Sequence, residues 1–352
     1  MPPSRFPPRS PRHDAIAASV RVRTCLRGVC LPTMEHMDLE PEAVSPDTRA
    51  RLERAVRAVR SSARRYPRAL VQSILSYGPP GDTAPTGLFD RIRGADPAFS
   101  WLGHASMVCN LAGVTIAVDP VLSVRIGARL GKRTLGLLRL QPAPATPECI
   151  RGVDLVLLTH AHFDHLDRPT LAAMSDRGTS VIAPPGVGAL VPGTFGRLHT
   201  LDAGKALSIR GLRIAAVQPR HWGARTLIDR HRRVNSYVVQ ADNLRVLFAG
   251  DTAYTESFAR HGPFDLAVFG IGAYNPWVHM HATPEQVVRM ADLSQSARLL
   301  PVHHSTFELS DEPLDEPMQR LRRAVQSGSS RLIEPQLGTI IDIDGRAIHR
   351  EQ

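Results

Sequence analysis

His160-Ala161-His162-Phe163-Asp164-His165 follows directly on the apolar run Leu155-Val156-Leu157-Leu158. A short apolar run bounded by a turn is typical of a buried strand, so we expect the polar residues on the loop at its carboxyl end. Neutral imidazoles and carboxylates are ligands of Zn²⁺ and similar divalent ions. Four such ligands within six residues predict more than one bound ion, because a structural zinc usually takes its four ligands from a longer stretch of chain.

Several other short apolar runs also end at a polar residue. Residues 114–118 precede Asp119, residues 212–217 precede His221, residues 246–248 precede Asp251 and residues 299–302 precede His303. Ligands of layered α/β proteins bind at the carboxyl ends of the strands, so we expect these side chains to meet there. The predicted ligand set is His160, His162, Asp164, His165, His221, Asp251 and His303.

Seven ligands suit two adjacent ions that share one carboxylate. Such a pair can hold a hydroxide between the ions and stabilise the charge that develops on an attacked phosphorus or carbonyl. No GxSxG motif, Walker loop or dinucleotide-binding fingerprint is present to suggest another chemistry. Helices are predicted over Pro169 to Met174 and over Pro284 to Leu293, the second behind a Thr283 cap with Gln286 at the capping-box position.

The first 44 residues differ from the rest in composition. They are rich in Pro, Arg and Ser without periodicity, which predicts a disordered tail. Whether the chain starts at Met1, Met34 or Met37 is left open. We therefore expect three parts: the tail over 1–44, a basic helical extension and linker over 45–95, and a hydrolase domain over 96–345.

The extension is predicted to begin with a helix. Ser45-Pro46-Asp47 combines a Ser cap, a first-turn Pro and an acid at the positive end of the dipole. Apolar residues then recur at helical spacing opposite a row of arginines, and the helix should end before Pro67; the apolar residues are Leu52, Val56, Val59 and Ala63. This basic face either docks on anionic lipid headgroups or lies in water.

Composition narrows the class of protein. The net charge is +10, but residues 1–93 hold 16 Arg against 9 Asp or Glu, whereas the remainder holds 27 Lys or Arg against 24 Asp or Glu. The site therefore lacks the basic surroundings expected of a nucleic-acid enzyme. No apolar run approaches the roughly 18 residues of a membrane span, and no secretory signal is visible. The four Cys form no CxxC pair, so we expect a cytoplasmic, reduced protein.

The motifs together resemble a known family. His160 to His165 resembles the HxHxDH signature of the metallo-β-lactamase superfamily, and further segments resemble its N-acylphosphatidylethanolamine-hydrolysing phospholipase D branch. Those segments are Trp101 to Ser106, Asp119-Pro120, His165-Leu166-Asp167, His221-Trp222, Arg225-Thr226-Leu227, Phe248 to Thr252, Gly262 to Ala267 and Gly272-Ala273-Tyr274. The resemblance spans roughly Phe99 to Leu314 and implies an α/β fold, the αβ/βα sandwich of that superfamily.

The resemblance also divides the ligands between two ions, expected to be Zn²⁺. One ion would take His160, His162 and His221, and the other Asp164, His165 and His303, with Asp251 as the bridge. His303 is preferred to His304 because Val302-His303-His304-Ser305-Thr306-Phe307 is similar to the family's His-Trp-Gly-Thr-Phe stretch at its first His. His304 then takes an aromatic position and is expected to be packed or solvated.

Further residues are expected near the metal centre. His281 is similar to a family His near the substrate phosphate, where it would orient the phosphoryl group or assist the leaving group; the alternative is a loop His with no role, as we expect for His279. Asp119 and Asp167 are expected to accept the outer N–H of ligand histidines. His104 matches the family, with its role left open.

The branch resemblance favours a phosphodiesterase of phospholipase D type acting on an N-acylphosphatidylethanolamine-like phospholipid. A lactonase or sugar-phosphate hydrolase is the alternative, and a non-catalytic metal sensor is a weaker one, because all seven ligand positions are filled. The resemblance allows a homodimer and peripheral contact with the inner membrane surface. A lipid substrate needs an apolar surface, and one candidate lip, which could instead cover the core, consists of Leu130, Leu135, Leu137, Leu138 and Leu140 with Arg129, Lys132, Arg133 and Arg139.

Overall fold

The computed structural model describes residues 87–131, 133–226, 229, 231–326, 328, 331–334 and 336–348, together with seven single residues of the basic extension. Those seven are helical and exposed, and they are Glu53, Val56, Arg57, Arg60, Ala63, Pro67 and Val71. Pro67 and Val71 are thus helical where the sequence predicted that the helix had ended. The expected tail over 1–44, the Ser45 cap and the alternative starts lie outside the described residues.

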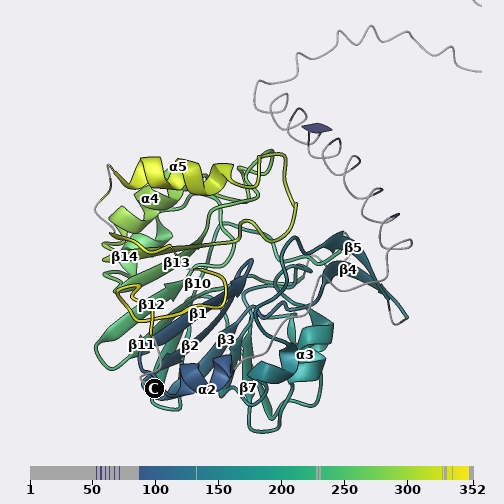
Figure 1. Cartoon of the computed structure of the whole chain (residues 1–352), viewed down its shortest axis with the longest axis vertical. Helices are drawn as coiled ribbons and strands as arrows, with labels where there is room; N and C mark the ends of the chain where they lie inside the picture. The colour runs from purple at the N-terminus through teal and green to yellow at the C-terminus, as the bar shows by residue number, and fades with distance from the viewer. Residues whose placement is uncertain are drawn as a thin grey trace, which may run out of the picture. The chain divides into compact units, whose positions relative to one another are not determined.

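Two seven-stranded sheets form the centre of the domain (Figure 1). The first sheet, in spatial order, is β16 (Ile340–Ile341), β1 (Ala98–Gly103), β2 (Ser106–Leu111), β3 (Val114–Val118), β6 (Leu155–Leu157), β7 (Ser180–Ala183) and β8 (Arg197–Thr200). The second is β15 (Arg331–Leu332), β14 (Arg298–Val302), β13 (Leu266–Gly270), β12 (Leu244–Phe248), β11 (Ser236–Ala241), β10 (Leu212–Val217) and β9 (Ala206–Ile209). Both sheets are mixed, since β3, β6, β7 and β8 pair in parallel, as do β12 to β15.

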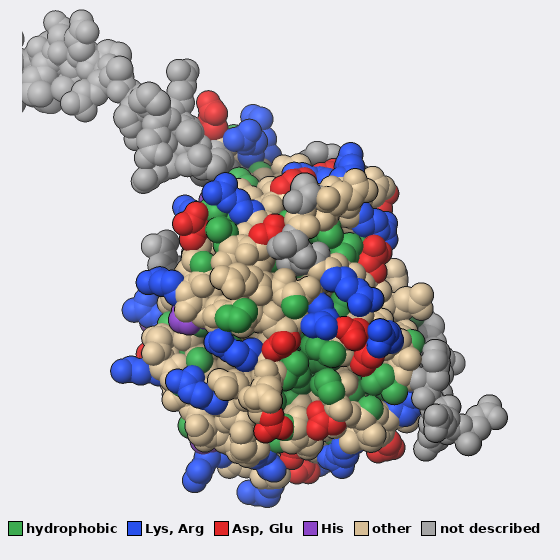
Figure 2. Space-filling view, turned by 90° about the vertical axis from the view of Figure 1, so that its left-hand side faces the viewer, with side chains coloured by type: hydrophobic (Ala, Val, Ile, Leu, Met, Phe, Trp, Pro, Cys, Tyr) green, Lys and Arg blue, Asp and Glu red, His purple; other side chains and the backbone are tan. Residues whose placement is uncertain are grey.

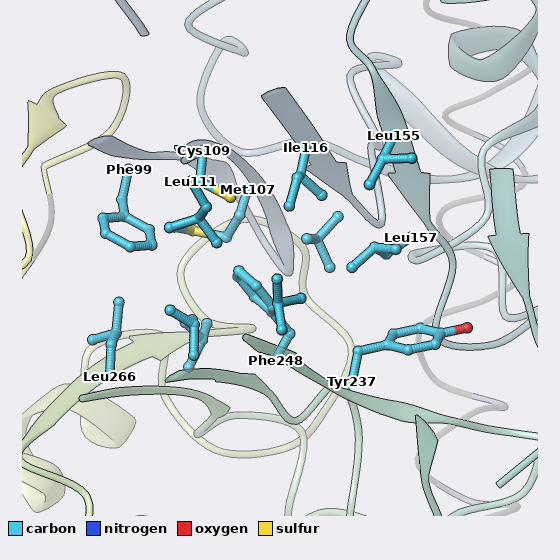
Figure 3. Close-up of a cluster of buried hydrophobic side chains, with 14 of the residues drawn as sticks. Phe99, Met107, Cys109, Leu111, Ile116, Leu155, Leu157, Tyr237, Phe248 and Leu266 are labelled. Carbon is cyan, nitrogen blue, oxygen red and sulfur yellow. The ribbon is translucent and has the colours of Figure 1, made fainter. Parts of the chain in front are cut away.

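The two sheets pack face to face on one apolar core (Figure 3). Alternate residues of β2, namely Met107, Cys109 and Leu111, face this core, as expected from the two-residue period of a strand. Tyr237 and Phe248 face it from the second sheet and are fully buried. The intervening residues of the same strands face outward, so each sheet needs a second covering layer.

Helices supply that covering layer. Residues of α2 (Leu88–Arg93) and α3 (Arg168–Met174) pack on the first sheet, and residues of α4 (Pro284–Leu293) and α5 (Glu316–Val325) pack on the second. Among the described residues, the connections contain three short 3₁₀ helices, Pro147–Ile150, Gly188–Leu190 and Ser257–Arg260. The order of layers is therefore helix, sheet, sheet, helix, which confirms the αβ/βα sandwich.

Local signals place two of these helices. Thr283 Oγ1 accepts a hydrogen bond from the Gln286 N–H, and Gln286 Oε1 accepts one from the Thr283 N–H, so α4 has the predicted capping box. The helix predicted from Pro169 begins one residue earlier, at Arg168, because Asp167 is its N-cap. Across the described ranges, no helix has both the length and the apolar composition needed to cross a membrane.

A separate hairpin stands outside both sheets (Figure 1). It consists of β4 (Arg125–Leu130) and β5 (Arg133–Leu138), which pair only with each other among the described strands. Ile126 pairs with Leu137 and Ala128 with Leu135, so these four side chains share one face.

On the face drawn in Figure 2, basic and acidic side chains of the described residues are interspersed, without a continuous basic surface.

Candidate metal centre

The carboxyl ends of four strands deliver the predicted ligands to one place. The loop after β6 carries His160 to His165, and single ligands follow β10, β12 and β14. Asp251, which follows β12, lies at the centre of the group. Its Oδ2 is 3.2 Å from His165 Nε2 and 3.7 Å from both His160 Nε2 and His221 Nε2. Its Oδ1 is 3.2 Å from His303 Nε2, so the carboxylate touches both halves of the cluster.

The imidazoles on one side of Asp251 form a triad. His162 Nδ1 is 2.9 Å from His160 Nε2 and 3.3 Å from His221 Nε2. Ligand atoms of these three residues and Asp251 all lie within 4.8 Å of one another. Burial lowers the pKa of His160 and His162, and it lowers the pKa of His221 to about 3. These histidines are therefore neutral at pH 7, which is the form that binds a metal ion.

A second group lies on the other side of Asp251. His303 Nε2 is 3.4 Å from Asp164 Oδ2, and His165 Nε2 is 3.8 Å from the same oxygen. Burial lowers the pKa of His165, but Asp251, Asp119 and Asp164 outweigh it and hold that pKa well above the ordinary value. The carboxylates around His165 thus favour a positive charge in this part of the cluster. Either a proton or a metal ion can supply that charge.

Unpaired polar atoms test whether the cluster fits a metal. Both carboxylate oxygens of Asp251, together with His165 Nε2 and His303 Nε2, are buried without a hydrogen-bond partner among the described residues. Orphaned buried polar atoms are rare and costly in folded proteins. Here they converge on one centre and are all oxygen or imidazole nitrogen, the donor set of a zinc-like ion. The residues therefore fit a divalent metal centre.

Hydrogen bonds behind the ligands fix their tautomers. The Nδ1–H of His165 donates to Asp119 Oδ2 at 2.7 Å, and the Nδ1–H of His221 donates to the Met280 carbonyl at 2.9 Å. In both residues Nε2 is left free to face Asp251. Asp119 therefore lies where the sequence predicted it.

Thr159, which was not predicted from the sequence, links Asp119 to His160. Its hydroxyl donates to Asp119 Oδ2 at 2.5 Å, and its oxygen lies 2.9 Å from His160 Nδ1. Because the hydroxyl proton is given to Asp119, the Nδ1–H of His160 donates to the hydroxyl oxygen. The one available signal was a hydroxyl residue directly before the first histidine of the cluster.

His104 lies behind the second group of ligands. Its Nε2–H donates to Asp164 Oδ2 at 2.9 Å, and its ring centroid is 3.9 Å from that of His303. Its carbonyl also accepts the backbone N–H of His303 at 2.8 Å. The residue whose role the sequence left open thus supports one carboxylate ligand and one imidazole ligand at once.

Asp167 departs from its prediction. The sequence predicted a ligand histidine as its partner, but its Oδ2 accepts from the hydroxyls of Ser123 and Thr170, both at 2.5 Å. It also accepts the Thr170 N–H at 3.3 Å, which makes it the N-cap of α3. Its carboxylate is used to start the helix, because the chain turns into α3 directly after the ligand loop.

The remaining histidines lie in different surroundings. His281 Nδ1 is 3.8 Å from Asp251 Oδ2, so His281 faces the centre. His304 instead stacks on Trp101, with ring centroids 4.9 Å apart, and its Nδ1 is 3.0 Å from Ser305 Oγ. His303, not His304, therefore reaches the cluster. His279 has its ring 6.3 Å from that of Trp277 and does not line the cavity described next.

A cavity of about 470 Å³ opens onto the cluster and is bounded by His162, Asp164, Asp251 and His281. The lining also includes residues of the shared face of the β4–β5 hairpin, together with Trp222, Trp277 and Met280. The cavity lining is therefore largely apolar but includes candidate metal ligands.

The predicted lip is only partly supported. Leu130, Leu138 and Leu140 are exposed, but Leu137 is buried against the cavity. Arg139 is 2% exposed: its Nη1 donates to the Leu102 carbonyl at 3.3 Å and its Nη2 to the Val121 carbonyl at 2.5 Å. Arg139 is thus excluded from any surface, and Lys132 lies outside the described residues.

Comparisons with known proteins agree with this geometry. The model of the beta-lactamase superfamily domain matches residues 115–304. An uncharacterised protein of Mycobacterium tuberculosis is 35% identical over 262 residues, covering 70% of this chain and 69% of its own. An N-acyl-phosphatidylethanolamine-hydrolyzing phospholipase D of Caenorhabditis elegans is 26% identical, covering 65% and 69%. A UPF0173 metal-dependent hydrolase of Aeropyrum pernix is 23% identical, covering 67% and 94%.

A solved structure shows the same fold. The isothiocyanate hydrolase from Delia radicum gut bacteria superposes with a TM-score of 0.56 at 18% identity, covering 70% of this chain and 98% of its own. The matched family domain contains the His/Asp cluster, and the cluster has the donor atoms that a metal ion requires. The chain therefore belongs to the metallo-β-lactamase superfamily, as one of its metal-dependent hydrolases.

Proposed function

We propose that the chain is a phosphodiesterase of phospholipase D type that uses two divalent ions, most simply Zn²⁺, and acts on an N-acylphosphatidylethanolamine-like or related phospholipid. The observation that carries the proposal is the central position of Asp251, whose Oδ2 faces His221 and His165 and whose Oδ1 faces His303, so that one carboxylate contacts both groups of imidazoles. A carboxylate shared between two ligand groups is the arrangement that a metal pair needs. The apolar cavity above it and the similarity to the worm phospholipase D support a lipid diester.

When bound, the metal pair would supply Lewis acidity and lower the pKa of water at the site. One ion would be held by His160, His162 and His221, and the other by Asp164, His165 and His303, with Asp251 shared. In the reaction, a water oxygen bonds to phosphorus, the bond from phosphorus to the alcohol oxygen breaks, and the alcohol leaves with a proton. The products are a phosphatidate-like monoester and the alcohol.

His281 would serve either the phosphoryl group or the leaving group. Its Nδ1 lies 3.8 Å from Asp251 Oδ2, and the residue lines the cavity. Burial holds the pKa of His281 well below its ordinary value, so the imidazole is neutral. A neutral imidazole can donate one hydrogen bond, which would orient a phosphoryl oxygen or the departing alcohol.

Metal analysis of the purified full chain tests the centre. We expect about two equivalents of zinc in the wild type, and a loss of metal in Asp251→Ala and His162→Ala. Asp202→Ala, which removes an exposed carboxylate, is the matched control and should keep both ions. No bound metal in the wild type, with no effect of the two variants, would overturn the metal centre.

A substrate panel then tests the bond that is cleaved. The panel consists of bis(p-nitrophenyl) phosphate, an N-acylphosphatidylethanolamine in mixed micelles, and an N-acyl homoserine lactone. Hydrolysis of both phosphodiesters, with retention of the phosphate on the glycerol product, supports the proposal. Turnover of the lactone alone would replace it with the lactonase alternative.

A further inference from the structure

Arg225 is fixed against the ligand loop by one edge of its guanidinium. Its Nη1 donates to the Ala161 carbonyl at 2.7 Å and to the Leu166 carbonyl at 2.8 Å, which uses both hydrogens of that nitrogen. The guanidinium carbon lies 3.9 Å from the ring centroid of Phe163, within cation–π range. Backbone hydrogen bonds and an aromatic face thus hold the planar group in one orientation.

The other edge of the same guanidinium has no partner. Neither Nε nor Nη2 makes a hydrogen bond with any described residue, and no described carboxylate lies within the 4.0 Å of an ion pair. Burial lowers the pKa of Arg225 to about 10, so the group remains charged at neutral pH. Asp167 and Asp164 stabilise this charge but do not outweigh the burial, so an anion that contacts the free edge would stabilise the half-buried guanidinium further.

The free edge is not enclosed in the protein interior, because neither Nε nor Nη2 is among the buried polar atoms that lack a partner. Arg225 lines the cavity beside His162 and Asp164, two of the candidate ligands. Among the described residues that line the cavity, it is the only Arg or Lys. A guanidinium presents parallel N–H groups that match two oxygens of one phosphate, and an apolar cavity strengthens that contact.

We infer that Arg225 is a specificity-determining residue that binds the anionic phosphoryl oxygens of the substrate beside the metal centre. The cavity would then select anionic phosphodiesters over neutral esters and lactones of similar size. This inference rests on the proposed function, which it deepens by giving the substrate a negative charge at a defined place. The hydrogen bonds from Arg225 to the ligand loop use only Nη1. Support of the loop therefore does not explain why the guanidinium also presents Nε and Nη2 without a protein partner among the described residues.

The test measures binding of an anion that is not turned over. Dimethyl phosphate is titrated by calorimetry into the zinc-loaded full chain as wild type, Arg225→Gln, Arg225→Lys and Arg213→Gln. Arg213 is the matched control because it is exposed on β10 and does not line the cavity. We expect about 10- to 100-fold weaker binding for Arg225→Gln, a smaller loss for Arg225→Lys, and no change for Arg213→Gln.

Metal content separates anion binding from support of the loop. The inference requires that Arg225→Gln keeps the metal content of the wild type while it loses affinity for dimethyl phosphate. Unchanged affinity at full metal content would overturn it. Loss of metal in both Arg225→Gln and Arg225→Lys would also overturn it, because Arg225 would then act only as a clasp on the ligand loop.

The inference and the proposed function fail in different ways. If the wild type cleaves no phosphodiester but binds dimethyl phosphate through Arg225, the proposed reaction is wrong and the anion site stands. If the wild type cleaves phosphodiesters and Arg225→Gln lowers kcat/KM equally for bis(p-nitrophenyl) phosphate and for the neutral p-nitrophenyl acetate, the anion site is wrong.

Discussion

The Thr159 hydroxyl lies 2.5 Å from Asp119 Oδ2 and donates a hydrogen bond to it. The same carboxylate oxygen accepts the Nδ1–H of His165, while the Thr159 oxygen accepts the Nδ1–H of His160. One buried carboxylate therefore sets the tautomer of an imidazole in each half of the cluster, directly in one half and through a hydroxyl in the other. Metal affinity in both halves should depend on this pair.

Asp119→Asn should weaken metal binding about 10- to 100-fold. The amide keeps the shape of the side chain but removes the charge that favours His165 Nδ1–H. Competition with a chromogenic chelator measures the affinity, and Asp202→Asn is the exposed control. Wild-type affinity in Asp119→Asn would show that the carboxylate does not support the ligands.

Thr159→Val should lower metal affinity about tenfold, whereas Thr159→Ser should stay near the wild type. Valine has the shape of threonine but can neither donate to Asp119 nor accept from His160, and serine retains both bonds. Because Asp119 also loses a buried donor, Thr159→Val should reduce the free energy of unfolding by about 1–3 kcal/mol. Chelator competition and urea unfolding measure the two effects, and equal behaviour of Val and Ser would contradict the relay.

Gly136→Ala should weaken substrate binding while leaving metal content unchanged. Gly136 has φ +154° and faces Gly127 across the hairpin, and a Cβ there would lie 2.1 Å from the Ile126 carbonyl oxygen. The strands would have to separate, which displaces the cavity wall formed by Ile126 and Leu137.

We expect KM for a micellar phospholipid to rise about tenfold in Gly136→Ala, as for other displacements of about 1 Å at a site. Gly131→Ala is the control, since it lies in the turn of the same hairpin with φ +59° but with open space around its Cβ. An unchanged KM in Gly136→Ala would mean that the hairpin wall does not contact substrate.

Glu285 and Arg320 should make stability depend on acid pH. Arg320 donates to the two oxygens of Glu285 at 2.9 and 2.7 Å, linking α4 to α5, and these bonds lower the pKa of Glu285 to about 2 from its ordinary 4.5. A depressed folded-state pKa stabilises the fold above pH 4.5, and that stabilisation is lost as pH falls from 4.5 to 2.

The Glu285 carboxylate is half exposed, so the effect should be at most about 1 kcal/mol. The difference in free energy of unfolding between the wild type and Glu285→Gln should be largest at pH 7 and should disappear near pH 2. Urea unfolding across this range measures it, with Glu148→Gln, an exposed residue of the Pro147–Ile150 turn, as the reference. A difference that does not change with pH would contradict the ion pair.

The predicted ligands were readable from the sequence because each is encoded locally. His160 to His165 follow a buried strand within the same short stretch, and Asp251 and His303 each follow another strand by one or a few residues. An apolar run that ends at a polar residue is visible without knowledge of its neighbours, and parallel strands then bring their carboxyl ends together. The capping box at Thr283 is equally local, since its two hydrogen bonds span three residues.

Other roles were decided only by the tertiary structure, because they depend on partners that are distant in the sequence. The hydrogen bond from His104 to Asp164 joins residues 60 positions apart, and that from Thr159 to Asp119 joins residues 40 apart. Asp167 was predicted to accept from a ligand histidine, but its partners are Ser123, which is 44 positions away, and Thr170 at the start of α3. Arg139 was predicted as part of a surface lip, yet it is buried and donates to the carbonyls of Leu102 and Val121. Sequence determines which donors and acceptors exist, whereas the packing of two sheets determines which of them meet.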